Sequence, residues 1–324
     1  MKNILLLLVV LFNFSLVAQQ NKTPIIKENA SYQVQYTSGV VYGKGLTHET
    51  LNSEKASKMD LLLDIYQPES REYNRPALVL IHGGGFKGGS RQTNHFKQMG
   101  NYFASRGWVV FSISYRLLKH KGTVPEEWKQ FGEEVQGQSP KRKAQIMAIY
   151  PALRDAKAAM RWIAANANEF GINMDYLTVL GSSAGAFSAI GIGVSNTDAF
   201  TNEISANTDP TLKTTNLEHT FKVRNLIDLW GGMAALEIHH RLYGTNQLDS
   251  SAPPIMIVHG TKDPTVEFSE ATKIKSAYEK AEVPCELIAL EGIGHGAWNT
   301  NFNGKNLTEL CYDYMIEQQK LIVE

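Results

Sequence analysis

From about residue 31 onwards, short apolar segments alternate with segments of helical periodicity. Several of the short segments, such as residues 77–81 and 108–113, are almost continuously apolar, which is typical of strands covered on both faces. Strands that alternate with helices predict an α/β fold with a mostly parallel sheet, flanked by helices on both faces. The expected strands lie at residues 32–36, 61–66, 77–81, 108–113, 177–180, 226–230, 254–258 and 286–290. The expected helices lie at about 152–166, from residue 184 onwards, at about 267–281 and at about 306–322.

Two stretches between these elements, residues 117–150 and 195–222, exceed the usual length of a loop. The first contains Trp128, Phe131 and many charged residues, and the second is rich in Asn and Thr. Each is either an insertion on the surface or a small lid over a site. Trp128, Phe131 and Tyr150 would contact a ligand only if the first stretch folds over that site.

The N-terminal 18 residues have the three-part pattern of a secretory signal peptide. Lys2 supplies a positive start, residues 4–17 form an apolar run, and polar residues follow Ala18. The run is too short for a comfortable membrane span, so an uncleaved anchor is the less favoured interpretation. We expect a secreted or periplasmic protein without stable membrane insertion, in which residues 1–18 are removed and residues 19–324 form a single domain.

The charge balance excludes some classes of partner. Lys and Arg together number 32, as do Asp and Glu, so the formal net charge is zero. This balance argues against a nucleic-acid partner and against steering of a ligand by overall charge. It leaves room for a local charged patch, so the charge of a ligand has to be judged at the site itself. Nothing in the sequence indicates an oligomeric state.

The two cysteines, Cys285 and Cys311, are expected in a strand and in the last helix. Export would allow a disulfide between them, but two free, buried thiols are the slightly favoured interpretation. No spacing of His or Cys residues resembles a metal site. We therefore expect no metal and no organic cofactor.

A candidate nucleophile lies in the segment Gly-Ser-Ser-Ala-Gly at residues 181–185. This segment directly follows an expected strand and directly precedes an expected helix. A serine on so sharp a turn has a strained backbone, and glycines two residues before and after it avoid collisions. The pattern predicts Ser183 as a nucleophile, whereas Ser182 is not in the central position. The alternative is a Gly/Ser turn without chemistry.

Candidate oxyanion donors lie in the segment His-Gly-Gly-Gly-Phe at residues 82–86, directly after the strand expected at 77–81. Glycines let backbone N–H groups face a site that side chains would block. Gly84 and Gly85, with the N–H of Ala184, are therefore predicted to stabilise an oxyanion. A phosphate-binding loop is disfavoured because neither the Walker spacing nor the dinucleotide fingerprint is present.

A candidate acid and base follow the last two expected strands, Asp263 after one and His295 in a glycine-rich loop after the other. The carboxyl ends of parallel strands meet at one edge of a sheet, so both side chains are expected beside Ser183. In this interpretation His295 removes the serine proton, and Asp263 fixes the imidazole tautomer and stabilises its charged form. His259 and Glu291 are the less favoured alternatives for the base and the acid.

Several motifs together resemble the carboxylesterase side of the α/β-hydrolase superfamily. The chain looks closest to the bacterial feruloyl/acetyl esterase-like group and is similar to the hormone-sensitive-lipase-type esterases. The residues that carry the resemblance are Leu-Asp-Ile-Tyr-Gln-Pro at 63–68, the segments 82–86 and 181–185, Ser-Ile-Ser-Tyr-Arg-Leu at 112–117, residues 259–266, and Gly294 with His295. After residue 117, some 30 residues stand where these families have a short Pro-rich link, so pocket shape is not carried over.

The resemblance implies a serine carboxylic-ester hydrolase with an acyl-enzyme on Ser183. Its expected partner is a small-molecule or carbohydrate-linked ester with a short acyl or aromatic-acyl group, including acetyl or feruloyl groups on plant polysaccharide. Phe86 and Trp298 are candidate substrate-binding residues. A serine peptidase of the same fold is the alternative. A non-catalytic binding protein is a weaker one, because no member of the Ser-Asp-His set is missing.

Overall fold

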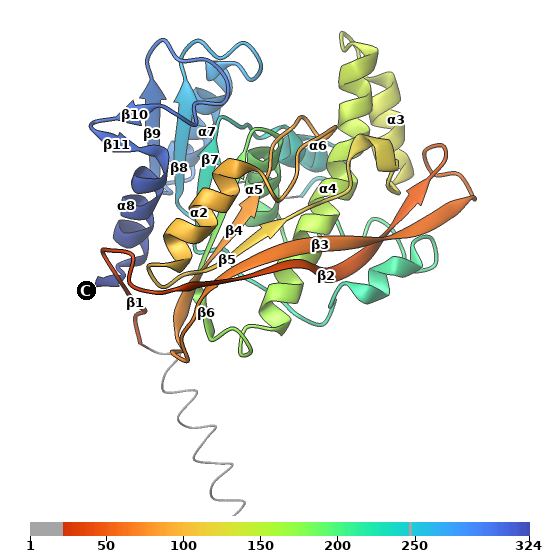
Figure 1. Ribbon diagram of the computed structural model, residues 1–324. Coiled ribbons are helices and arrows are strands. Elements are labelled where there is room, and N and C mark those ends of the chain that lie inside the picture. The colour runs from red at the N-terminus through yellow and green to blue at the C-terminus, as the bar shows by residue number, and fades with distance from the viewer. Residues whose placement is uncertain (1–21, 246–247) are drawn as a thin grey trace, which may run out of the picture.

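The computed structural model describes residues 22–245 and 248–324 of the chain. Within these residues the largest sheet has eight strands in the order β2-β3-β5-β4-β6-β7-β8-β9 (Figure 1). Its strands are β2 (Val34–His48), β3 (Ala56–Pro68), β4 (Arg75–Ile81), β5 (Val109–Ile113), β6 (Ile172–Ser182), β7 (Asn225–Leu229), β8 (Ile255–Gly260) and β9 (Cys285–Leu290). The predicted α/β class with a mostly parallel sheet is confirmed. Within this sheet β3 pairs in antiparallel fashion with both of its neighbours, β2 and β5, and the other neighbouring strands pair in parallel.

The burial of each strand follows from its place in the sheet. The inner strands β4 and β5 are buried along their whole length, as their apolar sequences predict. The edge strand β2 is much longer than the segment expected at residues 32–36. Its antiparallel partner β3 supplies hydrogen bonds from Val34 opposite Pro68 to His48 opposite Ala56, so pairing rather than local alternation determines its length.

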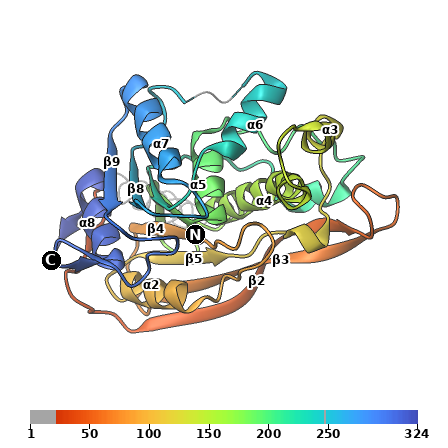
Figure 2. The same cartoon turned by 90° about the horizontal axis from the view of Figure 1, so that it is seen from above.

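Helices cover both faces of the sheet (Figure 2). On one face lie α2 (Asn94–Ala104) and α8 (Leu307–Gln319), and on the other lie α4 (Pro140–Ala165), α5 (Ala184–Val194), α6 (Ala234–Tyr243) and α7 (Phe268–Lys280). Apolar residues at helical spacing explain the placement of α2, since Phe96, Met99 and Phe103 are all buried against the sheet. The helices α2 and α6 are not among those expected from the sequence.

The stretch 117–150 is helical rather than a loop. It contains a 3-10 turn, η1 (Leu118–His120), the helix α3 (Glu126–Glu134) and the first turns of α4. The helix expected to begin at about residue 152 begins at Pro140, because Ser139 caps it and the ring of Pro140 suits a first helical position. Pro151, which reads as a helix boundary in the sequence, lies inside the helix. The α3–α4 hairpin stands above the carboxyl ends of the strands (Figure 1).

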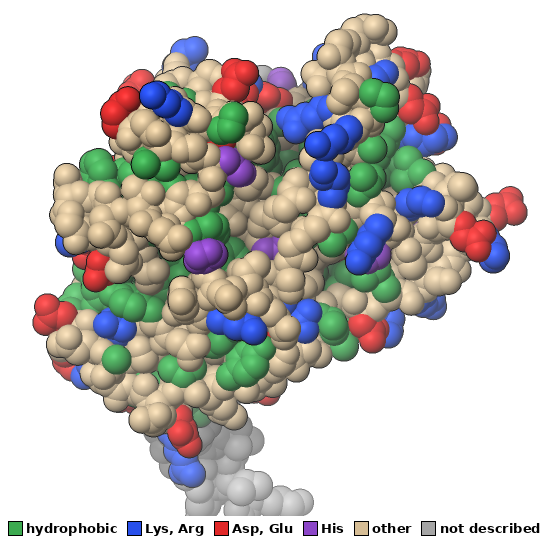
Figure 3. Space-filling model, turned by 45° about the horizontal axis from the view of Figure 1, so that its top comes forward, with side chains coloured by type: hydrophobic (Ala, Val, Ile, Leu, Met, Phe, Trp, Pro, Cys, Tyr) green, Lys and Arg blue, Asp and Glu red, His purple; other side chains and the backbone are tan. Residues whose placement is uncertain are grey.

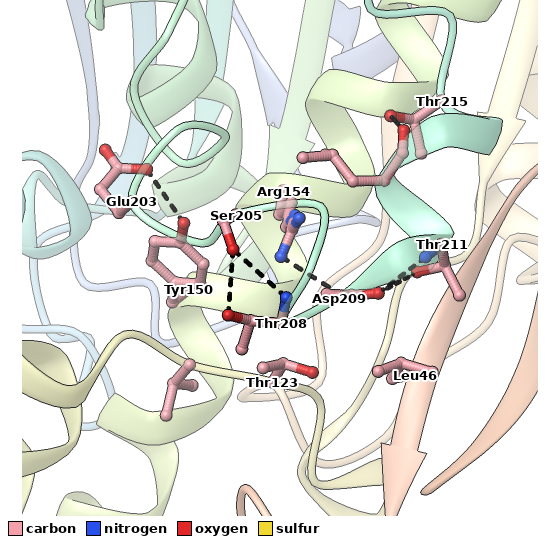
Figure 4. Close-up of polar contacts among 12 residues, drawn as sticks. Leu46, Thr123, Tyr150, Arg154, Glu203, Ser205, Thr208, Asp209, Thr211 and Thr215 are labelled. Atoms are coloured by element: carbon pink, nitrogen blue, oxygen red, sulfur yellow. Dashed lines mark hydrogen bonds and ion pairs between the residues drawn. The ribbon is translucent and has the colours of Figure 1, made fainter.

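The stretch 195–222 is fixed to α4 by buried polar contacts (Figure 4). Arg154 Nη1 lies 3.3 Å from Asp209 Oδ2, and the Tyr150 hydroxyl donates to Glu203 Oε2 at 2.9 Å. Asp209 also caps the short η2 (Pro210–Thr214) by accepting a hydrogen bond from the Thr211 N–H. These contacts hold the stretch against α4.

Both cysteines are free thiols in the structure, Cys285 half-buried and Cys311 buried. Burial raises the pKa of Cys285 to about 12, so its thiol is neutral at ordinary pH. Across residues 22–245 and 248–324, no helix is both long and apolar enough to cross a membrane. The predicted signal peptide, residues 1–18, lies outside the described residues.

Candidate active site

Ser183 lies on a sharp turn between β6 and α5. Its backbone has φ 51° and ψ −120°, a strained conformation for a residue with a side chain. A Cβ atom on Gly181 would lie 2.1 Å from the Gly185 carbonyl oxygen, and one on Gly185 would lie 1.9 Å from the Ile81 oxygen. The two glycines are therefore required by the close approach of backbone to backbone around the serine.

Ser183, His295 and Asp263 form a continuous hydrogen-bonded array. The Ser183 hydroxyl lies 2.9 Å from Nε2 of His295, and Nδ1 of the same ring lies 2.6 Å from Asp263 Oδ2. The three side chains follow β6, β9 and β8, so the carboxyl ends of three parallel strands bring together residues far apart in the sequence. The structure thus joins these three predicted residues through the imidazole of His295.

Asp263 is held as an anion. Burial alone would raise its pKa, but the hydrogen bond with His295 and those from the backbone N–H groups of Val266 and Thr265 lower it below the ordinary value. A permanently charged carboxylate at Nδ1 orients the imidazole so that Nε2 can accept the serine proton.

The glycine loop after β4 lies beside Ser183 because β4 and β6 are neighbours in the sheet. A Cβ atom on Gly83 would lie 3.1 Å from the Ser183 Cβ, so this glycine lies directly beside the nucleophile. Gly83 is not among the site residues predicted from the sequence. Gly84 and Gly85 both have positive φ, at 114° and 60°. Ala184 is the first residue of α5, so its N–H has no partner within the helix.

A pocket of about 850 Å³ opens at the array. Ser183 and His295 lie in its wall together with the glycine loop. Trp298, predicted to bind substrate, also lines it and stacks on His95 with ring centroids 4.5 Å apart. Trp230 packs edge-on against Trp298 at 5.0 Å. The space-filling view shows this hollow with His side chains in its walls (Figure 3). The pocket therefore offers one aromatic wall beside the nucleophile.

Other candidate wall residues lie elsewhere. Phe86 is buried in the core against Tyr115, because its positive φ turns it away from the pocket. Trp128 and Tyr150 are fully buried and pack against each other, and the Trp128 indole N–H donates to a backbone carbonyl of α4. Phe131 packs at the edge of the same cluster. These four aromatic side chains are packing residues and do not line the pocket.

The rival acid–base residues do not reach Ser183. The His259 ring is fully buried, and its Nε2 contacts the Val266 carbonyl oxygen at 2.9 Å behind Asp263. Glu291 is exposed on the loop before His295.

The α3–α4 hairpin contributes residues to the pocket that our sequence analysis missed. Gln138 lines it just before α4, and Lys141, Arg142 and Gln145 line it from the first turns of that helix. Their one sequence signal was the basic run at residues 141–143, which says nothing about where the helix starts. The stretch 195–222, by contrast, contributes no lining residue to this pocket.

The strand order and the Ser–His–Asp array define the α/β-hydrolase class. A model of the prolyl oligopeptidase family matches residues 94–321, and one of the carboxylesterase family matches residues 36–118. Because the first match spans more than half of the chain, the protein belongs to the prolyl oligopeptidase family.

Individual relatives are named esterases. Esterase LipC of Mycobacterium tuberculosis is 21% identical over 72% of this chain and 56% of its own length. Gut esterase 1 of Caenorhabditis briggsae is 30% identical over 40% of this chain and 20% of its own length. The chain thus spans about half, or less, of the length of these curated relatives. The solved structure of a Thermogutta terrifontis esterase with bound butyrate has a TM-score of 0.58 at 23% identity, covering 89% of this chain and 94% of that one. This last likeness concerns the fold.

Proposed function

We propose that this protein is a serine carboxylic-ester hydrolase that works through an acyl-enzyme on Ser183. The observation that carries the proposal is the single imidazole of His295, which bridges the Ser183 hydroxyl and the Asp263 carboxylate at hydrogen-bond distance on both sides. An activated hydroxyl of this kind attacks acyl carbon atoms.

In the proposed mechanism, His295 takes the Ser183 proton as the oxygen attacks the ester carbonyl. The N–H groups of Gly84, Gly85 and Ala184 stabilise the resulting oxyanion. His295 then gives the proton to the departing alcohol, which leaves the acyl group on the serine. Water, deprotonated by the same imidazole, attacks the acyl-enzyme, and the acid product leaves.

We propose short acyl or aromatic-acyl esters as substrates, including acetyl or feruloyl groups on plant polysaccharide. The esterase names of the relatives support ester cleavage, and the aromatic wall of Trp298 and Trp230 suits a planar acyl group. The motif resemblance to the feruloyl/acetyl esterase-like group supports the same range.

The first prediction concerns the nucleophile. Ser183→Ala should lower kcat for 4-nitrophenyl acetate by roughly 10⁴-fold or more, because a triad without its nucleophile retains only binding and oxyanion stabilisation. Ser188→Ala is the matched control, since that hydroxyl bonds to the carbonyl of Ala184 within the same helix. A fluorophosphonate should label the wild-type protein at Ser183 and leave Ser183→Ala unlabelled. Near wild-type hydrolysis by Ser183→Ala would show that the nucleophile is another residue.

A peptidase is the second candidate function, and the prolyl oligopeptidase family match favours it. The same Ser–His–Asp array can cleave amides. Comparison of a peptidyl 4-nitroanilide with a 4-nitrophenyl ester of similar size separates the two activities. A larger kcat/KM for the anilide than for the ester would show that the protein is a peptidase and would overturn the esterase proposal.

A further inference from the structure

Three cationic side chains line the pocket that contains Ser183. Lys87 comes from the loop after β4, and Lys141 and Arg142 come from the first turn of α4. The described residues that line this pocket include no Asp or Glu. In a chain with zero net charge, this is a local excess of positive charge at the mouth of the proposed active site.

In the part of the chain that the structure describes, these three cations have no acidic partner, unlike Arg91 and Arg116 deeper in the fold. Arg91 pairs with Asp64 at 2.6 Å and Arg116 with Asp155 at 2.7 Å. By contrast, within residues 22–245 and 248–324 the side chains of Lys87, Lys141 and Arg142 form no ion pair and no hydrogen bond. All three are exposed to solvent. Their charge is therefore available to a ligand.

The contacts of α4 place these charges in the wall of the pocket that contains Ser183. Gln145 donates from Nε2 to the Gly85 carbonyl oxygen at 2.9 Å, which joins the helix to the glycine loop. Lys141 and Arg142 precede Gln145 by four and three residues, so they share its face of the helix. Their positions on the helix lie about one turn, ~5 Å, further from the glycine loop than that of Gln145. Lys87 reaches the same region, since its Cε would lie 3.6 Å from a Cβ on Gly85.

We propose that the substrate of this site is an ester that carries an anionic group several bonds from the ester carbon. The wall formed by Lys87, Lys141 and Arg142, here called the cationic wall, binds that anion while Ser183 attacks the carbonyl. The inference rests on the proposed ester hydrolysis and narrows its substrate class. Lys and Arg side chains gather beside the hollow in the space-filling view (Figure 3).

A matched pair of substrates tests the cationic wall. The mono-4-nitrophenyl ester of glutaric acid carries a free carboxylate, and its methyl-capped analogue has the same chain without the charge. We expect the wild-type protein to prefer the charged ester in kcat/KM, and salt to reduce the preference by screening. Lys141→Glu/Arg142→Glu should lower the ratio of charged to neutral kcat/KM by about tenfold or more, since two exposed cations are replaced by anions.

Lys58→Glu/Lys97→Glu is the control, because it changes the net charge equally at exposed lysines outside the pocket. The ratio of kcat/KM for the charged ester to kcat/KM for the neutral ester should be the same in this control as in the wild type. The proposal is overturned if the wild type shows no preference for the charged ester, or if both double variants shift the ratio equally.

Failure of the proposed function gives a different result. If neither ester is hydrolysed, ester hydrolysis is wrong, and binding then decides the inference alone. Calorimetry with Ser183→Ala should show the charged ester binding more tightly than the neutral one, and the added Lys141→Glu/Arg142→Glu changes should abolish the difference. Equal binding of both esters would contradict the cationic wall.

Discussion

Two residues at the ends of the neighbouring strands β6 and β7 are unusual. Ser183 has a strained backbone conformation, and Asp228 has a raised side-chain pKa. Asp228 lies in β7, fully buried. Its Oδ1 accepts a hydrogen bond from the Gly231 N–H at 2.7 Å, while Oδ2 has no partner among the described residues. Burial raises the pKa of Asp228 to about 7, and the nearby Glu270 carboxylate acts in the same direction. This carboxyl is therefore protonated below neutral pH, although an ordinary aspartate is charged there.

The raised pKa predicts a pH-dependent cost to stability. From about pH 4 to 7 the folded state holds a proton that the unfolded state has released, so this group lowers the unfolding free energy as pH rises. Asp228→Asn cannot titrate. The unfolding free energy of this variant, relative to that of the wild type, should rise by roughly 2–3 kcal/mol between pH 5 and pH 8, as measured by urea denaturation. Exposed Asp175→Asn should show no such trend. If the unfolding free energies of Asp228→Asn and the wild type differ by the same amount at pH 5 and pH 8, Asp228 does not hold a proton in the folded state.

Among the helices, α4 connects the core to the pocket. Its middle holds Asp155, which binds the Arg116 guanidinium through both oxygens and also accepts from the Arg116 backbone N–H at 2.7 Å. Arg154 on the same helix holds the stretch 195–222 through Asp209 (Figure 4). Its first turn carries Lys141 and Arg142 of the cationic wall. The position of the pocket residues on α4 thus depends on buried ion pairs further along that helix.

Breaking the buried pair should destabilise the whole domain. Asp155→Ala leaves the Arg116 guanidinium, 2% exposed, with only the more distant Asp209 carboxylate at 4.0 Å, which should cost about 3 kcal/mol of unfolding free energy. Glu126→Ala breaks the exposed pair with Lys129 on α3 and should cost less than about 1 kcal/mol. Chemical denaturation of both variants measures the contrast. Similar small losses in both variants would mean that the buried Arg116–Asp155 pair contributes little to the unfolding free energy.

The two ends of the described chain meet in the whole molecule. Strand β1 (Ile25–Ile26) pairs in parallel with β12 (Ile322–Val323), and Lys27 Nζ lies 2.8 Å from Glu324 Oε2. Ile26 is fully buried against the face covered by α2 and α8. The packed part of the molecule therefore begins only a few residues after the proposed end of the signal peptide.

We propose that the protein is exported and that residues 1–18 are removed. N-terminal sequencing of the secreted or periplasmic protein should give a terminus at or near Gln19, which leaves Ile26 and its strand intact. A mature terminus beyond Ile26 would remove a buried residue and contradict this arrangement. An intact Met1 in the exported fraction would instead support a membrane anchor.

Local rules made part of this protein predictable. Apolar runs located the central strands, and the glycines at 181 and 185 identified the turn at Ser183, because both patterns express backbone geometry within a few residues. Asp263 and His295 followed from the rule that strand ends share one edge. The start of α4 and the burial of Phe86 were not predictable, since Pro151 resembles a boundary and a left-handed backbone redirected the phenyl ring.

The sequence by itself determined the fold class, the turn that presents Ser183 and the chain order of its partners. Only the tertiary structure decided that β4 lies beside β6, which brings Gly83 against the nucleophile, and that α4 brings Lys141 and Arg142 to the same pocket. The physical reason is the distance along the chain over which the deciding interactions act. Strand patterns and turn glycines depend on neighbours in the chain, whereas strand order and helix placement depend on how distant apolar surfaces are buried together.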